Sequence, residues 1–254
     1  MKKVLVIVIL LFTASFVTAQ HSKKEPVIEF STGVDFVSGF IWRGLNLGSS
    51  PAIQPNASIS AFGFELAAFG SYALIASEYH HFDKVPYTEF DLELKYSMHT
   101  KAGEFSLLVS DIFLPYEGLA YSNFDGVVDN EKTGAHDLGA GIEYEGPEHF
   151  PISFRLEYHF HNDPNRSIYG ELGYRFACGE TDIRLFFGAA MGTNGDLHGS
   201  EFYEIEEDEI GIINVGATIS KEIKVTDSFS IPLNTSVVFN PYANAAYLVV
   251  SLSL

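Results

Sequence analysis

Tyr247-Leu-Val-Val-Ser-Leu-Ser-Leu254 is the stretch that decides the fold. Every second residue from Leu248 to Leu254 is bulky and apolar, and the residues between them are smaller or polar, which is the two-residue period of a β-strand with one apolar face. The sequence stops inside this strand. Alternating strands of this kind are typical of bacterial outer-membrane β-barrels, so we expect an export signal and further strands in the rest of the chain.

The N-terminus has the composition of a secretory signal peptide. Two lysines precede an apolar run from Val4 to Val17, and Ala19 supplies a small residue for signal-peptidase cleavage. An uncleaved anchor helix is the weaker interpretation, because the run is shorter than the roughly 20 residues that span a bilayer. We expect a cleaved signal peptide at 1–19, a short periplasmic segment at 20–26 and one barrel domain at 27–254.

Composition excludes some classes of protein and partner. After the signal, no stretch approaches 18 consecutive apolar residues, which excludes a helical membrane protein. Removal of residues 1–19 takes away two of the 15 basic residues and none of the 33 acidic ones; the resulting formal charge of -20 argues against nucleic acid as a partner. The single cysteine, Cys178, cannot form an intramolecular disulfide, and we expect it in a turn.

Alternation with a period of two recurs along the whole chain after the signal, without a competing helical period. The clearest case is residues 88–98, where acidic and other polar residues alternate with aromatic and aliphatic ones. Pro55 and Pro232 fall inside predicted strands, where each would remove a ladder hydrogen bond, so bulges or shifted boundaries are expected there. The predicted strands are 28–42, 52–61, 64–74, 88–98, 104–114, 136–145, 152–161, 167–176, 182–190, 210–220, 229–240 and 245–254.

These strands predict an all-β fold, a closed antiparallel up-and-down transmembrane β-barrel of about 12 strands. An exported β-sandwich would show the same alternation, but its strands average roughly five or six residues, which is shorter than those predicted here. In the first strand we expect Phe40 and Trp42 to face lipid. Short turns are expected at the periplasmic end, including 221–228, and long outer loops at 43–51, 75–87, 115–135 and 191–209.

Most charged strand residues fall on the face that would line the lumen. Acids outnumber bases there, so an open lumen should favour cations or polar neutral solutes, and acids of strand 88–98 could face bases across it. Alternatively, these charges pair and fill the barrel, whose size lies between filled eight-stranded barrels and open sixteen-stranded porins. The candidate selectivity residues are Glu89, Asp91, Glu93, Glu143, Arg155, Glu157, Glu171, Arg175, Asp182 and Arg184.

Arg43-Gly44 lies where the first predicted strand meets its outer loop. Gly44 would allow the chain to turn with a positive φ, and Arg43 could anchor the loop to an inward carboxylate. A structural clasp is favoured over a substrate ligand, because the arginine stands alone.

Several short motifs occur in the first part of the chain: Phe40-Ile-Trp-Arg-Gly44, Pro51-Ala-Ile-Gln54, Gly63-Phe64, Gly70-Ser71 and Glu89-Phe-Asp91. With Ser167-Ile-Tyr-Gly-Glu171 and Asn240-Pro241 fitting the later part, the chain resembles the TorF-like family of outer-membrane porins. Tyr72 departs from the pattern, because the family commonly has Asn after the hairpin Ser. The resemblance implies an outer-membrane channel without catalytic residues, and it names no solute.

Other candidate sites are weaker, and we expect no metal and no cofactor. The acidic run Glu201–Glu209 could bind Ca²⁺ but lacks calcium-loop spacing, so a solvated charge run is favoured. His80-His81, beside Glu78 and Asp83, could bind a transition metal, although adjacent histidines are weak evidence.

A lipid hydrolase and a non-conducting structural or surface-binding barrel are the alternative functions. His159, His161, Ser153 and Glu157 offer hydrolytic groups, but residues two apart on one strand are separated by about 6.6 Å, and no enzyme signature is present, so we expect no enzyme. The expected location is the outer membrane of a Gram-negative bacterium. The expected partners are outer-membrane lipid and lipopolysaccharide, the barrel-assembly machinery, periplasmic chaperones and small solutes.

Overall fold

The computed structural model describes the part of the chain that follows the predicted signal peptide and periplasmic segment, which both lie outside the described residues. The described residues contain no helix long and apolar enough to span a membrane. They are 28–75, 86–115, 120–124, 127–128, 131–132, 136–163, 166–192, 203, 205, 209–227 and 229–254.

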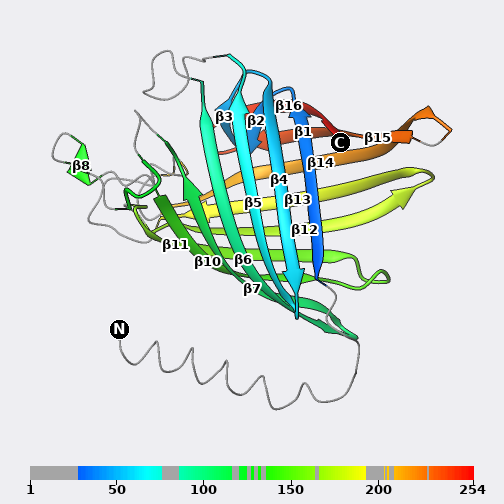
Figure 1. Cartoon of the computed structure of the whole chain (residues 1–254), viewed down its shortest axis with the longest axis horizontal. Helices are drawn as coiled ribbons and strands as arrows, with labels where there is room; N and C mark the ends of the chain where they lie inside the picture. Colours follow the sequence, from blue (N-terminus) through cyan, green and yellow to red (C-terminus); the bar gives the residue numbers. More distant parts are fainter. Residues whose placement is uncertain are drawn as a thin grey trace.

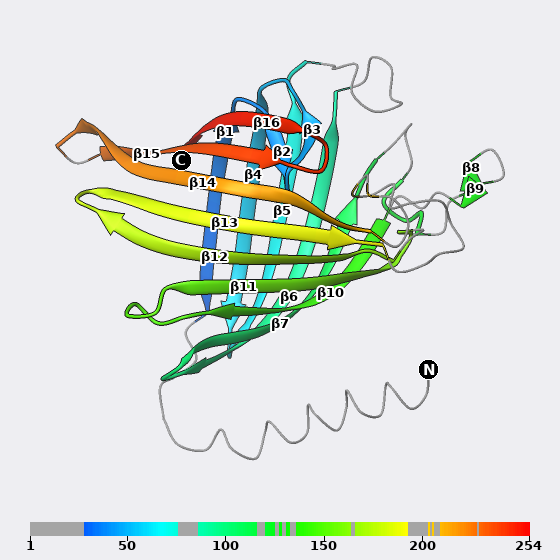
Figure 2. The ribbon, with the colours of Figure 1, turned by 180° about the vertical axis from the view of Figure 1, so that it is seen from behind.

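Twelve strands of the described chain form one closed barrel, as predicted (Figures 1 and 2). All pairs are antiparallel, and β1 closes the ring by pairing with both β4 and β16. The barrel strands are β1 (Glu29–Val37), β4 (Ala52–Ala61), β5 (Phe64–Ala73), β6 (Thr88–Thr100), β7 (Gly103–Phe113), β10 (His136–Glu145), β11 (Ile152–His161), β12 (Ile168–Cys178), β13 (Thr181–Met191), β14 (Ile210–Thr226), β15 (Phe229–Asn240) and β16 (Ala245–Ser253). Separate hairpins are β2 (Phe40–Trp42) with β3 (Leu45–Gly48), and β8 (Val127–Val128) with β9 (Glu131–Lys132).

The two ends of the barrel differ in their connections. At the turn end, where β16 finishes, short links join β4 to β5, β6 to β7, β10 to β11, β12 to β13 and β14 to β15. The other end, called the loop end, carries most of the longer connections. Since β14 continues to Thr226, the predicted turn 221–228 is wrong over most of its length. Cys178 is exposed and is the last residue of β12, next to a turn.

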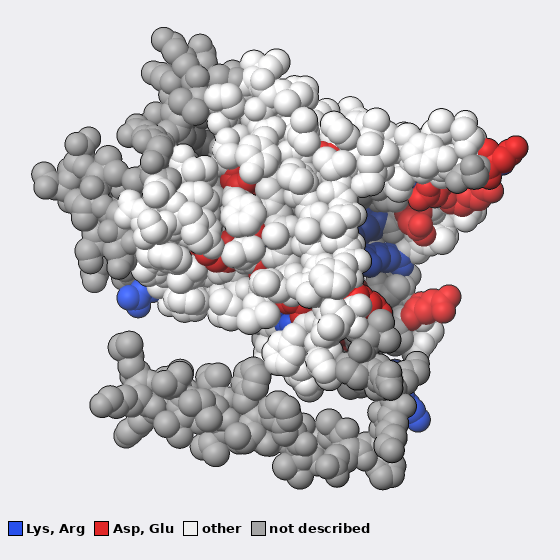
Figure 3. Space-filling view, in the orientation of Figure 1, with Lys and Arg blue, Asp and Glu red and all other residues white. Residues whose placement is uncertain are grey.

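The outer surface of the barrel is apolar and the interior is polar, because the alternation of each strand separates the two faces. Leu107 and Leu248 on the outside are 58% and 66% exposed, whereas Glu89 and Glu157 on the inside are 2% and 1% exposed. In Figure 3 the flank is largely free of charged side chains, and acidic side chains gather at the right, at the turn end. The polar groups of these strands are therefore kept away from the barrel's outer surface.

A β-bulge in β14 shapes the interior near the loop end. Gly188 of β13 pairs with Asn214 and Ala189 pairs with Ile212, so Ile213 is an extra residue without a partner in β13. A bulge changes the direction of neighbouring side chains. Ile213 and Asn214 are consequently both buried, with 0% and 7% exposure, although they are adjacent in a strand.

The two prolines lie in register and their strands keep the predicted bounds, so neither the bulges nor the shifted boundaries expected at them are present. Pro55 pairs with Val34 of β1, and the β4–β5 ladder skips it while keeping the same register on either side. Pro232 pairs with Glu222, and its strand begins to pair with β16 only at the next residue.

The first strand is shorter than predicted, and the predicted outer loop at 43–51 is also wrong. β1 ends at Val37, and the chain then forms the hairpin β2–β3 (Figure 1). Phe40 does not lie on the outer surface, because it is buried with its ring 6.0 Å from that of Phe69. Trp42 stacks on Tyr203, with ring centroids 5.7 Å apart. The alternation of aromatic residues continues from β1 into β2 because both strands have an apolar face. The period alone therefore did not reveal that β1 ends at Val37.

The ring closes over a short seam. All nine residues of β1 pair with β4, but only Asp35–Val37 pair with β16. Val34 and Leu254 add two backbone hydrogen bonds, of 3.0 and 2.9 Å. The contact between the first and last barrel strands is therefore the shortest in the ring.

Candidate functional site

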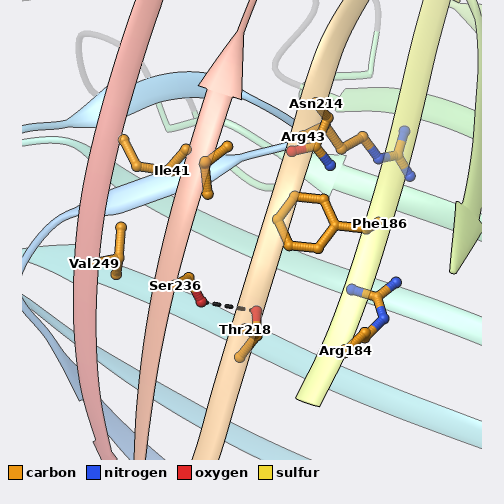
Figure 4. A pocket seen from close by; sticks show the side chains of 9 residues that line it. Ile41, Arg43, Arg184, Phe186, Asn214, Thr218, Ser236 and Val249 are labelled. Atoms are coloured by element: carbon orange, nitrogen blue, oxygen red, sulfur yellow. Dashed lines mark hydrogen bonds between the residues drawn. The ribbon is translucent and has the colours of Figure 1, made fainter. Parts of the chain in front are cut away.

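The hairpin β2–β3 crosses the interior of the barrel near the loop end. Its residues contact inward-facing side chains from different parts of the wall: Phe40 lies beside Phe69 of β5, and Arg43 binds Glu157 of β11. Ile41 borders a cavity together with Val249 of β16 (Figure 4). The hairpin therefore narrows the lumen from within.

A two-residue turn forms the tip of the hairpin. Arg43 and Gly44 have φ values of 50° and 82°, the pattern of a type I′ turn, which requires a positive φ at both central residues. The Gly44 carbonyl oxygen accepts a hydrogen bond of 3.1 Å from Nδ2 of Asn240. A Cβ on Gly44 would lie 1.7 Å from the carbonyl oxygen of Ile213, so the tip can approach the β14 bulge only with glycine at this position.

The Arg43 guanidinium is held on all sides. It lies between the rings of Trp42 and Tyr169, 4.3 and 4.4 Å from their centroids. Nη2 donates to Glu157, and Nη1 donates to the Tyr203 hydroxyl at 2.6 Å. Burial alone would lower the pKa of Arg43, but the Glu157 carboxylate together with Tyr203 and Tyr169 outweighs the effect of burial and raises the pKa above its usual value. Arg43 is therefore a permanent cation, and it has the geometry expected of a clasp.

Glu157 connects the hairpin to the wall of the barrel. Besides Arg43, it binds Arg155, which donates from Nε at 3.0 Å and from Nη2 at 2.8 Å. The Ser110 hydroxyl donates to its other oxygen at 2.5 Å. With 1% of its surface exposed, this carboxylate is shared by two guanidinium groups in a site that excludes solvent.

His159 lies next to this group and is fully buried. Its Nδ1 is 2.5 Å from Oδ1 of Asp137, and its Nε2 is 3.1 Å from the Tyr203 hydroxyl. Of the other hydrolytic candidates, Glu157 belongs to the same group. His161 contacts the Phe124 carbonyl oxygen, and Ser153 lies at the opposite end of β11. His159 is thus oriented by Asp137 toward the hairpin tip.

An apolar cluster packs around the hairpin near the loop end. Leu45 of the hairpin is buried against Ile213 of the bulge and against residues that precede β14. Tyr203 and Ile205 from that connection are each 1% exposed, and burial raises the pKa of Tyr203 above its usual value, so its hydroxyl stays protonated and can donate. The cluster comprises Leu45, Tyr169, Ala190, Tyr203, Ile205 and Ile213, with Trp42, Leu47 and Tyr242 packed against it.

Many of the predicted lumen charges form ion pairs. Arg155 binds Glu93 of β6 at 2.8 Å and also Glu143, so a base of β11 reaches an acid three strands away. Arg184 pairs with Glu171. These contacts show the pairing of charges, which is one part of the alternative prediction that the charges pair and fill the barrel.

The remaining predicted lumen residues lie outside this network. Arg175 and Asp182 are exposed toward the turn end, where Arg175 lies 3.7 Å from Glu145. Glu89 is buried and accepts a hydrogen bond from Tyr87. Oδ1 of Asp91 is buried without a hydrogen-bond partner among the described residues.

Several contributors to the site were missed by sequence reasoning. Tyr203 lies within the predicted acidic run, Tyr169 is an inward aromatic residue in a strand with a repeating aromatic pattern, and Asn214 faces inward only because of the bulge. Asn240 had a signal in the Asn-Pro segment of the family resemblance. No spacing in the sequence links any of them to Arg43.

The two segments that were weighed as metal sites, and not favoured, are largely outside the described part of the chain. Glu78, His80, His81 and Asp83 all lie there, and the run Glu201–Glu209 is described only at Tyr203, Ile205 and Glu209. Glu209 accepts a hydrogen bond of 3.0 Å from Tyr242. Among the described side chains, no group of three or more potential ligands is placed to hold a metal ion.

Comparison with known proteins gave no match to a protein-family model and none to a curated sequence.

Proposed function

We propose that the protein is a small-solute channel of the bacterial outer membrane, narrowed at its loop end by the hairpin β2–β3. The observation that carries this proposal is a closed barrel with an apolar outer surface and a charged interior, the distribution that suits a lipid environment around an aqueous lumen. The turn end is assigned to the periplasm, because such barrels have short periplasmic turns. The predicted signal peptide agrees with this location.

The interior favours cations and polar neutral solutes in this proposal. Three guanidinium groups, those of Arg43, Arg155 and Arg184, pair with four carboxylates, those of Glu93, Glu143, Glu157 and Glu171. One negative charge is left over in this network. Fixed charge of one sign raises the local concentration of counter-ions in a narrow pore.

Membership of the TorF-like family is part of the same proposal. The segment Phe40–Gly44, which carries much of the resemblance, forms β2 and the tip of the hairpin. Its Arg-Gly pair forms the turn of the hairpin, in which Arg43 binds Glu157 and the position of Gly44 admits only glycine. The family pattern thus coincides with a structural requirement at both positions.

A non-conducting structural barrel is the second candidate, favoured by the apolar cluster that packs inside the barrel near the loop end. Conductance in planar bilayers distinguishes the two when the wild type is compared with a hairpin deletion. Because Val37 and Ala52 are direct partners, a turn of about four glycine and asparagine residues can replace 38–51 without changing the β1–β4 register.

We expect a small, steady, cation-selective current from the wild type and a current several-fold larger from the deletion variant. Current from the deletion variant alone would favour the structural barrel. An absence of current from both correctly folded proteins would refute the channel, and a preference for anions would refute the acidic-lumen mechanism.

A further inference from the structure

A cavity of about 190 Å³ lies between the hairpin and the wall formed by β13 to β16. The hairpin forms one boundary through Ile41 and Arg43, and inward side chains of β13 to β16 form the others (Figure 4). Pockets for drug-sized ligands typically have volumes of about 300–1,000 Å³, so this one suits a molecule of roughly ten non-hydrogen atoms.

The cavity has an apolar side and a cationic side. Ile41 and Val249 lie on one side, and the guanidinium groups of Arg43 and Arg184 lie on the other, with the Phe186 ring between them (Figure 4). The residues that line the cavity include two arginines and no acid. An amphipathic ligand with an anionic head would match this arrangement.

Arg184 has hydrogen-bonding capacity beyond its one carboxylate partner. Glu171 accepts from Arg184 through Oε1, while its Oε2 accepts from the Tyr169 hydroxyl at 2.5 Å and from Asn214 at 2.8 Å. That carboxylate is therefore well supplied with donors. A guanidinium carries five N–H donors, and among the described residues Nε of Arg184 is buried without an acceptor.

The floor of the cavity adds hydroxyl groups. Thr218 and Ser236 are 2.9 Å apart and share one hydrogen bond, so one of their two hydroxyl protons remains to be donated elsewhere. Arg43, by contrast, is occupied by Glu157 and Tyr203 and contributes mainly charge.

We propose that this cavity binds a small monocarboxylate with a short apolar or aromatic tail. The carboxylate accepts hydrogen bonds from Arg184 and from the Thr218–Ser236 pair, and the tail packs against Ile41, Val249 and Phe186. This site is a local exception to the acidic surplus of the lumen, because neither Glu157 nor Glu171 lines the cavity. The proposal does not require the barrel to conduct.

Binding can be measured by ¹⁹F NMR on the purified full-length barrel in an uncharged detergent, with 4-fluorobenzoate as the probe. Its isosteric amide, 4-fluorobenzamide, and the cation 4-fluorobenzylamine are the matched ligands. We expect the carboxylate to bind at least about tenfold more tightly than the amide, since a hydrogen bond to a charged group contributes roughly 1.5–3 kcal/mol.

Two variants and a control test the assignment of residues. Arg184→Gln should weaken benzoate binding by about tenfold or more while leaving the weak binding of the amide unchanged. Arg175→Gln removes an arginine that does not line the cavity and should have no effect. Val249→Phe fills the apolar side and should weaken the carboxylate and the amide together.

Heat-modifiable mobility on gels identifies the folded variants. Equal affinity for benzoate and its amide, preference for the amine, or unchanged benzoate binding in folded Arg184→Gln would each overturn the proposal. If Arg184→Gln does not fold, Val249→Phe decides: unchanged benzoate binding in that variant would place the ligand elsewhere.

Discussion

Gly44→Ala should release the hairpin from the wall of the barrel. The new Cβ would lie 1.7 Å from the Ile213 carbonyl oxygen, about half the 3.4 Å at which ordinary contacts begin, so the tip must withdraw. Withdrawal breaks the hydrogen bond from Asn240, which costs about 1 kcal/mol, and alanine at positive φ costs about 1–2 kcal/mol. Together these terms shift the docking equilibrium by roughly 2–3 kcal/mol, or about 30- to 140-fold.

Trp42 provides a direct assay because it is the only tryptophan in the chain. In the docked hairpin its ring stacks on Tyr203 and lies against the Arg43 guanidinium. Release of the hairpin exposes the ring, so acrylamide quenching should increase and the emission maximum should move to longer wavelength in Gly44→Ala. Conductance should rise in parallel if the hairpin narrows the lumen.

Gly179→Ala is the matched control. Gly179 has a φ of +65° and lies in the turn between β12 and β13, and its Cβ would have no neighbour within 4 Å. It therefore carries a similar backbone penalty without the steric clash, and quenching of Trp42 should stay as in the wild type. Equal quenching in Gly44→Ala and Gly179→Ala would refute the reasoning that contact with the bulge holds the hairpin.

Two further changes test the ion pairs and the orientation of the barrel. Glu157→Gln leaves Arg43 and Arg155 without their shared carboxylate, which should cost about 3–5 kcal/mol and lower the temperature of the heat-induced gel shift, whereas Ser110→Ala removes one hydrogen bond and should cost about 1 kcal/mol. An equal effect of the two would contradict the central role of Glu157. A membrane-impermeant maleimide should label exposed Cys178 only after the outer membrane is permeabilised, since the turn end is assigned to the periplasm; labelling on intact cells would reverse that assignment.

The barrel could be predicted from the sequence because its determinants are local. Each strand shows its alternation within about ten residues, and the terminal stretch from Leu248 to Leu254 appears in the structure as β16 with its apolar side chains exposed. The polar face of residues 88–98 likewise became the inward face of β6.

The interior site could not be predicted in the same way, because its contacts join distant residues. Arg43 was singled out as a clasp, but its partner Glu157 is 114 residues away and its partner Tyr203 is 160 residues away. The bulge at Ile213 has no local sequence signal that we recognised. The aromatic residues of β2 continue the two-residue period of β1. The sequence pattern therefore predicted one long strand, whereas the chain turns into the lumen after Val37.

The hairpin also affects the order in which the barrel assembles, because the seam between β1 and β16 is short. Gly44 lies at the tip of the hairpin that follows β1. It is hydrogen-bonded to Asn240 at the end of β15, 196 residues later, and the hairpin tip rests on β14. The hairpin can therefore dock only when the last strands have been added, at the same stage as β1 meets β16. Contacts of such long sequence separation form late because closing the intervening loop is entropically costly. Once docked, the hairpin links the N-terminal and C-terminal strands from inside the ring. It thereby reinforces a seam of three residue pairs, where the strands would otherwise separate first.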